Sequence, residues 1–67
     1  MADFPKFTPD TVLSAEHDGE GWLIRADIPG REPFFFGGYA ATAKDAHWAA
    51  GECARGLGCR LAPLRLN

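Results

Sequence analysis

Residues 42–58 read TAKDAHWAAGECARGLG, and this stretch predicts the one long helix of the chain, around which the other elements must pack. Thr42 is followed three residues later by Asp45, a pattern typical of a helix N-cap with an acid in the first turn. Gly58 is a natural left-handed stop. We therefore expect a helix over residues 43–57.

The predicted helix has an aromatic residue on its polar side. Successive residues are turned by about 100° around a helix axis, and one narrow apolar stripe then collects Ala46, Ala49, Ala50, Cys53 and Leu57. Trp48 points roughly the opposite way. Its neighbours on that face are Lys44, Glu52 and Arg55. A large aromatic among charges needs a cover, from the protein's own chain or from a partner.

Two strands are predicted before the helix. Residues 11–17 and 22–28 read as strands, and residues 18–21, Asp-Gly-Glu-Gly, supply the turn of a hairpin. In the second strand, alternation places Trp22, Ile24, Ala26 and Ile28 on one face and Leu23, Arg25 and Asp27 on the other. This pattern indicates a sheet with one buried face.

A third and a fourth strand complete the pattern. Phe34 begins a strand after a turn rich in proline and glycine at residues 29–33. Phe35 must face away from Phe34 and Phe36, so this strand is either buried on both faces or exposes an aromatic ring. Residues 59–66 read as a fourth strand, which Pro63 confines to a sheet edge or makes irregular.

These elements predict an α+β fold of order β-β-β-α-β, an antiparallel β-meander with one helix packed on it. Residues 1–10 read as an extended N-terminal arm that carries Phe4 and Phe7, and residues 11–67 as a single α+β domain. A chain of 67 residues can bury only one thin core.

Charge and hydropathy limit the partners. The net charge of −2 is too close to neutral to drive nonspecific nucleic-acid binding. Residues 1–34 hold seven acidic and three basic side chains, whereas residues 35–67 hold two and four. This asymmetry either orients a charged partner or is a chance feature of a solvated surface. Without a membrane span or a signal-peptide pattern, we expect a cytoplasmic protein with no membrane partner.

The sequence offers no reactive constellation. Ser14 has no nucleophile-elbow motif around it, and a helix separates Cys53 from His47 by roughly 240°. The spacing of Cys53 and Cys59 is not that of a structural zinc site, and we expect free thiols. We therefore expect no enzyme, no cofactor and no metal.

The run from Asp18 to Arg25, an aromatic strand, and residues 41–46 opening an alanine-rich helix together resemble small bacterial and phage β-β-β-α proteins. The order is also similar in outline to the N-terminal domain of HicB-type antitoxins, in which a glycine-rich hairpin ending in a Pro-Gly turn precedes such a helix. Ile28-Pro29-Gly30 matches that turn. In size class the chain resembles anti-CRISPR-type inhibitors. These resemblances imply binding to another protein.

Protein binding accounts best for the unusual features, because tryptophan and arginine are enriched at binding hot spots. Gly51, one turn from Trp48, would let another backbone approach the helix closely. The predicted partner-binding residues are Trp48, Lys44, Glu52, Arg55 and Phe35. Phe35 could also be covered by a second copy in a homodimer.

We predict a small non-enzymatic protein-interaction module, a phage or mobile-element inhibitor that occupies a partner's surface. The alternative is a nucleic-acid-binding or antitoxin-like module. Its phosphate contacts would come from Lys44, Arg55, Arg60 and Arg65. Two covers for Trp48 stay open at this point, namely the arm with Phe4 and Phe7, and an external partner.

Overall fold

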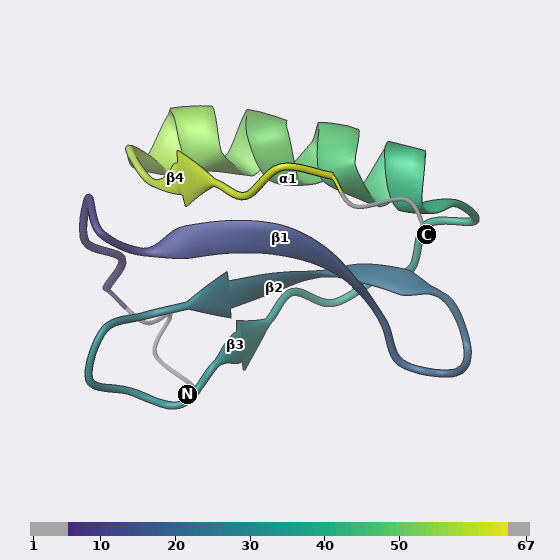
Figure 1. The fold of residues 1–67 in the computed structure, drawn as a ribbon, viewed down its shortest axis with the longest axis horizontal. Coiled ribbons are helices and arrows are strands. Elements are labelled where there is room, and N and C mark those ends of the chain that lie inside the picture. Colours follow the sequence, from purple (N-terminus) through teal and green to yellow (C-terminus); the bar gives the residue numbers. More distant parts are fainter. Residues whose placement is uncertain (1–5, 65–67) are drawn as a thin grey trace.

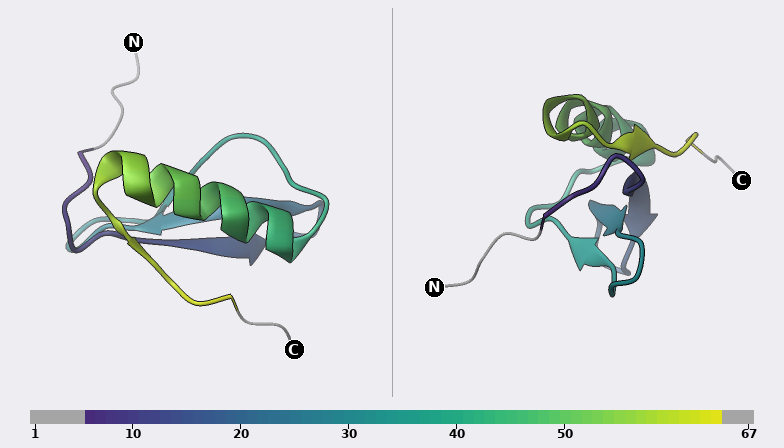
Figure 2. Two further views of the ribbon diagram at one scale, coloured as in Figure 1. Left: turned by 90° about the horizontal axis from the view of Figure 1, so that it is seen from above. Right: turned by 90° about the vertical axis from the view of Figure 1, so that its left-hand side faces the viewer.

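The structure, a computed structural model, describes residues 6–64. One helix lies on one face of a four-stranded sheet, so the molecule has two layers (Figure 1; Figure 2, right). In chain order the elements are β1 (Val12–His17), β2 (Trp22–Asp27), β3 (Phe34–Phe35), α1 (Ala43–Leu57) and β4 (Arg60–Leu61). The predicted α+β class and the β-β-β-α-β order are confirmed.

The sheet has the order β3-β2-β1-β4 and is mixed. Its first three strands form the predicted antiparallel meander, in which Leu13 lies opposite Ala26 and Ala26 opposite Phe34. β4 lies on the far side of β1 and runs parallel to it. β3 and β4 therefore point the same way, and α1 is the crossover that two parallel strands of one sheet require.

The ends of α1 follow from local chemistry. The Thr42 hydroxyl accepts a hydrogen bond from the Asp45 backbone N–H at 3.1 Å, which satisfies one of the donors that a helix start leaves unpaired. Gly58 adopts a left-handed φ of 72° and donates its N–H to the carbonyl of Ala54. The predicted bounds of the helix are confirmed at both ends. Within residues 6–64, no helix has both the length and the apolar character of a membrane span.

The buried stripe of α1 consists of alanines. The buried helix residues are Ala43, Ala46, Ala50 and Ala54. The stripe predicted from the sequence is therefore partly wrong, since Leu57 is 41% exposed and Cys53 only half-buried. The stripe is turned toward Ala43 and Ala54, which places Cys53 and Leu57 at its rim.

The core is small and lies between α1 and the centre of the sheet. It is built around Leu13, which is fully buried, together with Ala26, Ala50 and Ala54. α1 packs on β1, β2 and β4. The inner side of β3 is covered by the ring of Phe7.

Phe7, Phe34 and Phe36 form an aromatic cluster that packs against this core. The ring centroids of Phe7 lie 5.9 Å from those of both Phe34 and Phe36, and Phe34 and Phe36 meet edge to face at 5.4 Å. These separations are typical of favourable aromatic pairs. The described part of the N-terminal segment therefore packs against β3.

β4 is much shorter than the strand predicted over residues 59–66. Only Arg60 and Leu61 pair with β1, and the Ala62 N–H adds one further bond to the Leu13 carbonyl at 2.8 Å. Pro63 follows and has no N–H to donate, so the ladder ends there. Residues 65 and 66, the last two of the predicted strand, lie outside the described residues.

Replacing Leu13 by alanine should destabilise the fold by about 3 kcal/mol, because it leaves a cavity at the centre of the core. A domain of this size rarely has more than about 3–5 kcal/mol of stability, so we expect the variant to be largely unfolded. Urea denaturation followed by circular dichroism measures the change. Leu57→Ala is the matched control and should cost less than about 1 kcal/mol, since this side chain is at the rim. Equal losses for the two variants would contradict the assigned core.

Candidate protein-binding surfaces

The first candidate surface is the solvent side of α1. Trp48 is 70% exposed there. Lys44, Glu52 and Arg55 are also exposed, one or two helical turns away on the same face. The Arg55 guanidinium contacts the Glu52 carboxylate at 3.3 Å. The structure therefore brings together four of the five predicted binding residues around an open indole ring, and we call them the Trp48 face.

The Trp48 face is fixed in orientation by the rest of the fold. The alanine stripe lies on the opposite side of α1, and the cap at each end prevents the terminal turns from fraying. A large apolar ring on a rigid helix loses little conformational freedom when a partner covers it.

The space beside Gly51 is occupied by the protein's own chain. A Cβ atom on Gly51 would lie 3.3 Å from the Leu61 side chain, so the close approach predicted for a partner is made by β4. One turn earlier, the His47 ring nitrogen Nε2 lies 3.1 Å from the carbonyl oxygen of Ala62. The segment that begins at β4 therefore borders the helix beside the Trp48 face.

The cover that the sequence suggested for Trp48, an arm carrying Phe4 and Phe7, is not formed by Phe7. The Phe7 ring stacks on Phe36 instead, with an angle of 16° between the ring planes. Phe4 lies outside the described residues.

Phe35 belongs to a different surface. It alternates with Phe34 and Phe36, whose rings pack into the core, so it points from the sheet face opposite α1. Its ring is 46% exposed, and the Arg25 guanidinium lies 5.9 Å from the ring centroid. The five predicted residues therefore do not form one site.

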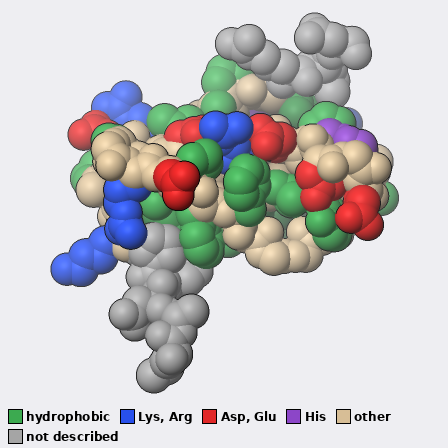
Figure 3. Space-filling view, turned by 90° about the horizontal axis from the view of Figure 1, so that it is seen from below, with side chains coloured by type: hydrophobic (Ala, Val, Ile, Leu, Met, Phe, Trp, Pro, Cys, Tyr) green, Lys and Arg blue, Asp and Glu red, His purple; other side chains and the backbone are tan. Residues whose placement is uncertain are grey.

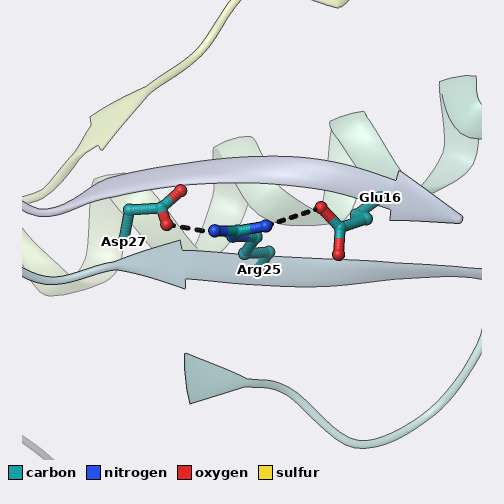
Figure 4. A network of polar contacts seen from close by, with 3 residues as sticks. All are labelled: Glu16, Arg25 and Asp27. Atoms are coloured by element: carbon teal, nitrogen blue, oxygen red, sulfur yellow. Dashed lines mark hydrogen bonds and ion pairs between the residues drawn. The ribbon is translucent and has the colours of Figure 1, made fainter. Parts of the chain in front are cut away.

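Arg25 is held between two carboxylates on this outer sheet face (Figure 4). Its Nη1 donates to Glu16 Oε1 and its Nε to Asp27 Oδ1, both at 2.9 Å. The hydrogen bond to Glu16 and then that to Asp27 raise the pKa of Arg25. Partly exposed pairs of this kind contribute little to stability, but they fix where the guanidinium points.

A groove of about 440 Å³ opens beside this network and forms the second candidate surface. It is lined by Glu16, Asp18, Leu23, Phe35, Phe36 and residues 37–39. Seen from below, on the side away from α1, the molecule shows hydrophobic side chains bordered by acidic and basic ones (Figure 3). An apolar floor with charged groups at its rim is a common form of binding site.

Tyr39 forms one wall of the groove, and the sequence analysis missed it. Its hydroxyl donates to Asp18 Oδ2 at 2.6 Å, and its ring lies against Gly21, where a Cβ atom would be 3.2 Å away. Asp18 also accepts hydrogen bonds from the backbone N–H groups of Glu20 and Gly21. The bond from Tyr39, followed by that from Glu20, lowers the pKa of Asp18, and the same contact raises the pKa of Tyr39.

The remaining candidate ligands are engaged elsewhere. In the described range, no three His, Cys, Asp or Glu side chains gather as a metal site would require. His17 Nδ1 accepts a hydrogen bond from the Gly19 backbone, and burial raises the pKa of the Cys59 thiol. Arg60, a predicted phosphate contact, lies 3.7 Å from an Asp10 carboxylate oxygen. Arg65 lies outside the described residues.

Comparisons with known proteins identify no relative. The chain matches no protein-family model, and neither the curated proteins nor the solved structures contain a significant match. The role of each surface is therefore inferred from its own residues alone.

Tyr39→Phe should raise the pKa of Asp18 toward its ordinary value, because it removes the phenolic donor. A folded-state pKa below the unfolded value means that the carboxylate stabilises the fold above pH 3.8 and that this contribution is lost as the pH falls through the folded value. The variant should lose less stability on acidification in this window. Carboxyl ¹³C shifts measured against pH report the titration directly.

Gly21→Ala perturbs the same bond by another route, because its methyl group would lie 3.2 Å from the Tyr39 side chain and force that side chain to shift. It should raise the Asp18 pKa, but by less than Tyr39→Phe does, because the phenolic donor is kept. Gly37→Ala is the control, since nothing lies within 4 Å of its added methyl group. An unchanged Asp18 titration in both Tyr39→Phe and Gly21→Ala would show that the hydroxyl does not set the carboxyl pKa.

Proposed function

We propose that this protein is a small non-catalytic interaction module that binds another protein through the Trp48 face. The observation that carries the proposal is the 70% exposure of Trp48 on a helix that is capped at both ends. A ring of this size leaves much apolar surface in water, and a partner that covered it would gain the corresponding burial free energy.

The composition around the ring supports a protein partner. Arg55 supplies a planar cation and Lys44 a flexible one, while Glu52 restrains Arg55 through their ion pair. Aromatic and arginine anchors surrounded by weaker polar contacts are typical of protein interfaces. Because the ring and the charges project from a helix, a groove on the partner is the complementary shape.

In its finer form, the proposal is an inhibitor that acts by occupying the surface of its target. A chain of 67 residues has little volume for a substrate cavity but can cover a patch on a larger protein. Its source in a phage or mobile element and its anti-CRISPR-type role stay predictions from size and pattern.

The test is affinity capture from extracts of the source cells, with the captured proteins quantified by mass spectrometry. Trp48→Ala should lose the partner, because removal of a hot-spot ring costs about 2 kcal/mol or more, roughly thirtyfold in affinity. Arg55→Ala, which retains the ring, should also weaken capture and so separates specific recognition from adhesion to an exposed indole.

Leu57→Ala is the control, since it removes an exposed apolar side chain from the other side of the same helix. It should keep the partner. Trp48→Ala should change the free energy of unfolding by less than about 0.5 kcal/mol, because the ring is mostly in solvent. If a folded Trp48→Ala variant captured every protein that the wild type captures, the Trp48 face would not be the binding surface.

A further inference from the structure

The groove on the outer sheet face has walls suited to a planar cation. Phe35 and Tyr39 are 46% and 58% exposed, and the buried side chain of Leu23 also lines the groove. Guanidinium groups favour the faces of aromatic rings. Phe35 already has one such neighbour in Arg25, at 5.9 Å from the ring centroid.

The charge at the groove is negative. Glu16 and Asp18 line it, and Glu16 and Asp27 both pair with Arg25, so three carboxylates and one guanidinium lie in or beside the groove. Glu16 contacts Arg25 through Oε1, and a carboxylate can accept several hydrogen bonds. The positive charge of Arg25 is thus shared by two acids, and the field in the groove still favours a further cation.

The groove adjoins β3, the outer strand of the sheet. The Phe36 N–H bonds to the Ile24 carbonyl at 2.9 Å, and hydrogen-bonded and non-bonded pairs alternate along an antiparallel ladder. The backbone groups of Phe35 therefore point away from β2. An extended segment that ran along this edge would place alternate side chains over the outer sheet face, where the groove lies.

We propose that this groove binds an extended, arginine-bearing segment of a partner protein, with guanidinium groups between Phe35 and Tyr39 and against the carboxylates of Glu16 and Asp18. Charge complementarity selects this occupant. The groove and the Trp48 face lie on opposite layers of the molecule, so the two surfaces can be tested separately.

The experiment is an NMR titration of the ¹⁵N-labelled protein with the peptide acetyl-Ser-Arg-Thr-Arg-Ser-amide, whose two arginines share one side of an extended chain. The control peptide has citrulline, a neutral isostere, in place of both arginines. The arginine peptide should shift amide signals of residues 16–25 and 35–39, and the citrulline peptide should bind at least about tenfold more weakly. Added salt should reduce the affinity of the arginine peptide.

Three variants test whether the arginine peptide binds in the groove. Glu16→Gln keeps an oxygen that can accept from Arg25 but removes the charge, and it should weaken the arginine peptide by about tenfold. Phe35→Ala should weaken it to a similar degree, whereas Trp48→Ala should leave it unchanged. Peptide shifts confined to the Trp48 face, equal affinity for the two peptides, or no shifts at millimolar peptide would overturn the proposal. Acetyl-arginine amide binding as tightly as the peptide would also overturn it, since the site would then serve a small molecule.

Discussion

The structure depends on the alanine contact between α1 and the sheet. The four buried residues of the helix are all alanines, and two of them, Ala50 and Ala54, pack with Leu13 and Ala26. Small side chains let the helix backbone lie close to the strands, and any larger residue in the stripe would have to push the layers apart. Because the layers are so close, few aromatic rings fit between them. The large rings lie accordingly at the margins of this contact: Phe7, Phe34 and Phe36 pack together against the core, and Trp48 lies on the solvent side of the helix.

The two-layer arrangement places the acidic first half and the more basic second half of the sequence on different sides of the molecule. The acidic first half of the sequence contains β1 and β2, and the more basic second half contains α1 and β4. Folding therefore places the carboxylates of Glu16, Asp18 and Asp27 on the outer sheet face, and Lys44 and Arg55 on the helix layer. A molecule with two such faces can meet two different surfaces, one on each side.

Features set by local chemistry could be predicted from the sequence, and features set by distant contacts could not. The helix bounds depend on Thr42 and Gly58, which act on their own neighbours, and the meander depends on turns of a few residues. The direction of β4 depends on the crossover of α1, and the length of β4 depends on its pairing with β1. The sequence left open whether the third strand is buried on both faces or exposes Phe35. The position of α1, which covers only one face of the sheet, decides that Phe35 is exposed.

The candidate sites divide in the same way. Helical geometry alone placed Trp48, Lys44, Glu52 and Arg55 on one face, as the structure has them. It could not show that Leu61 occupies the space beside Gly51, because that contact joins α1 to β4. Tyr39 was missed for the same reason, since its partners Asp18 and Gly21 are about twenty residues earlier in the chain. Gly21, the glycine directly before β2, was the available signal, because a glycine at a strand often marks the close approach of another part of the chain.

The parallel pairing of β4 with β1 gives residues 60–62 a protective role. They hydrogen-bond to Thr11 and Leu13 along the side of β1 that faces away from β2. Without them, the strand that holds the centre of the core would present an open row of backbone donors and acceptors, which is the template on which chains add to one another in aggregates. Loss of residues 60–62 would therefore turn β1 from an interior strand into an edge strand. The molecules would then self-associate through this edge while the helix and the hairpin were still folded.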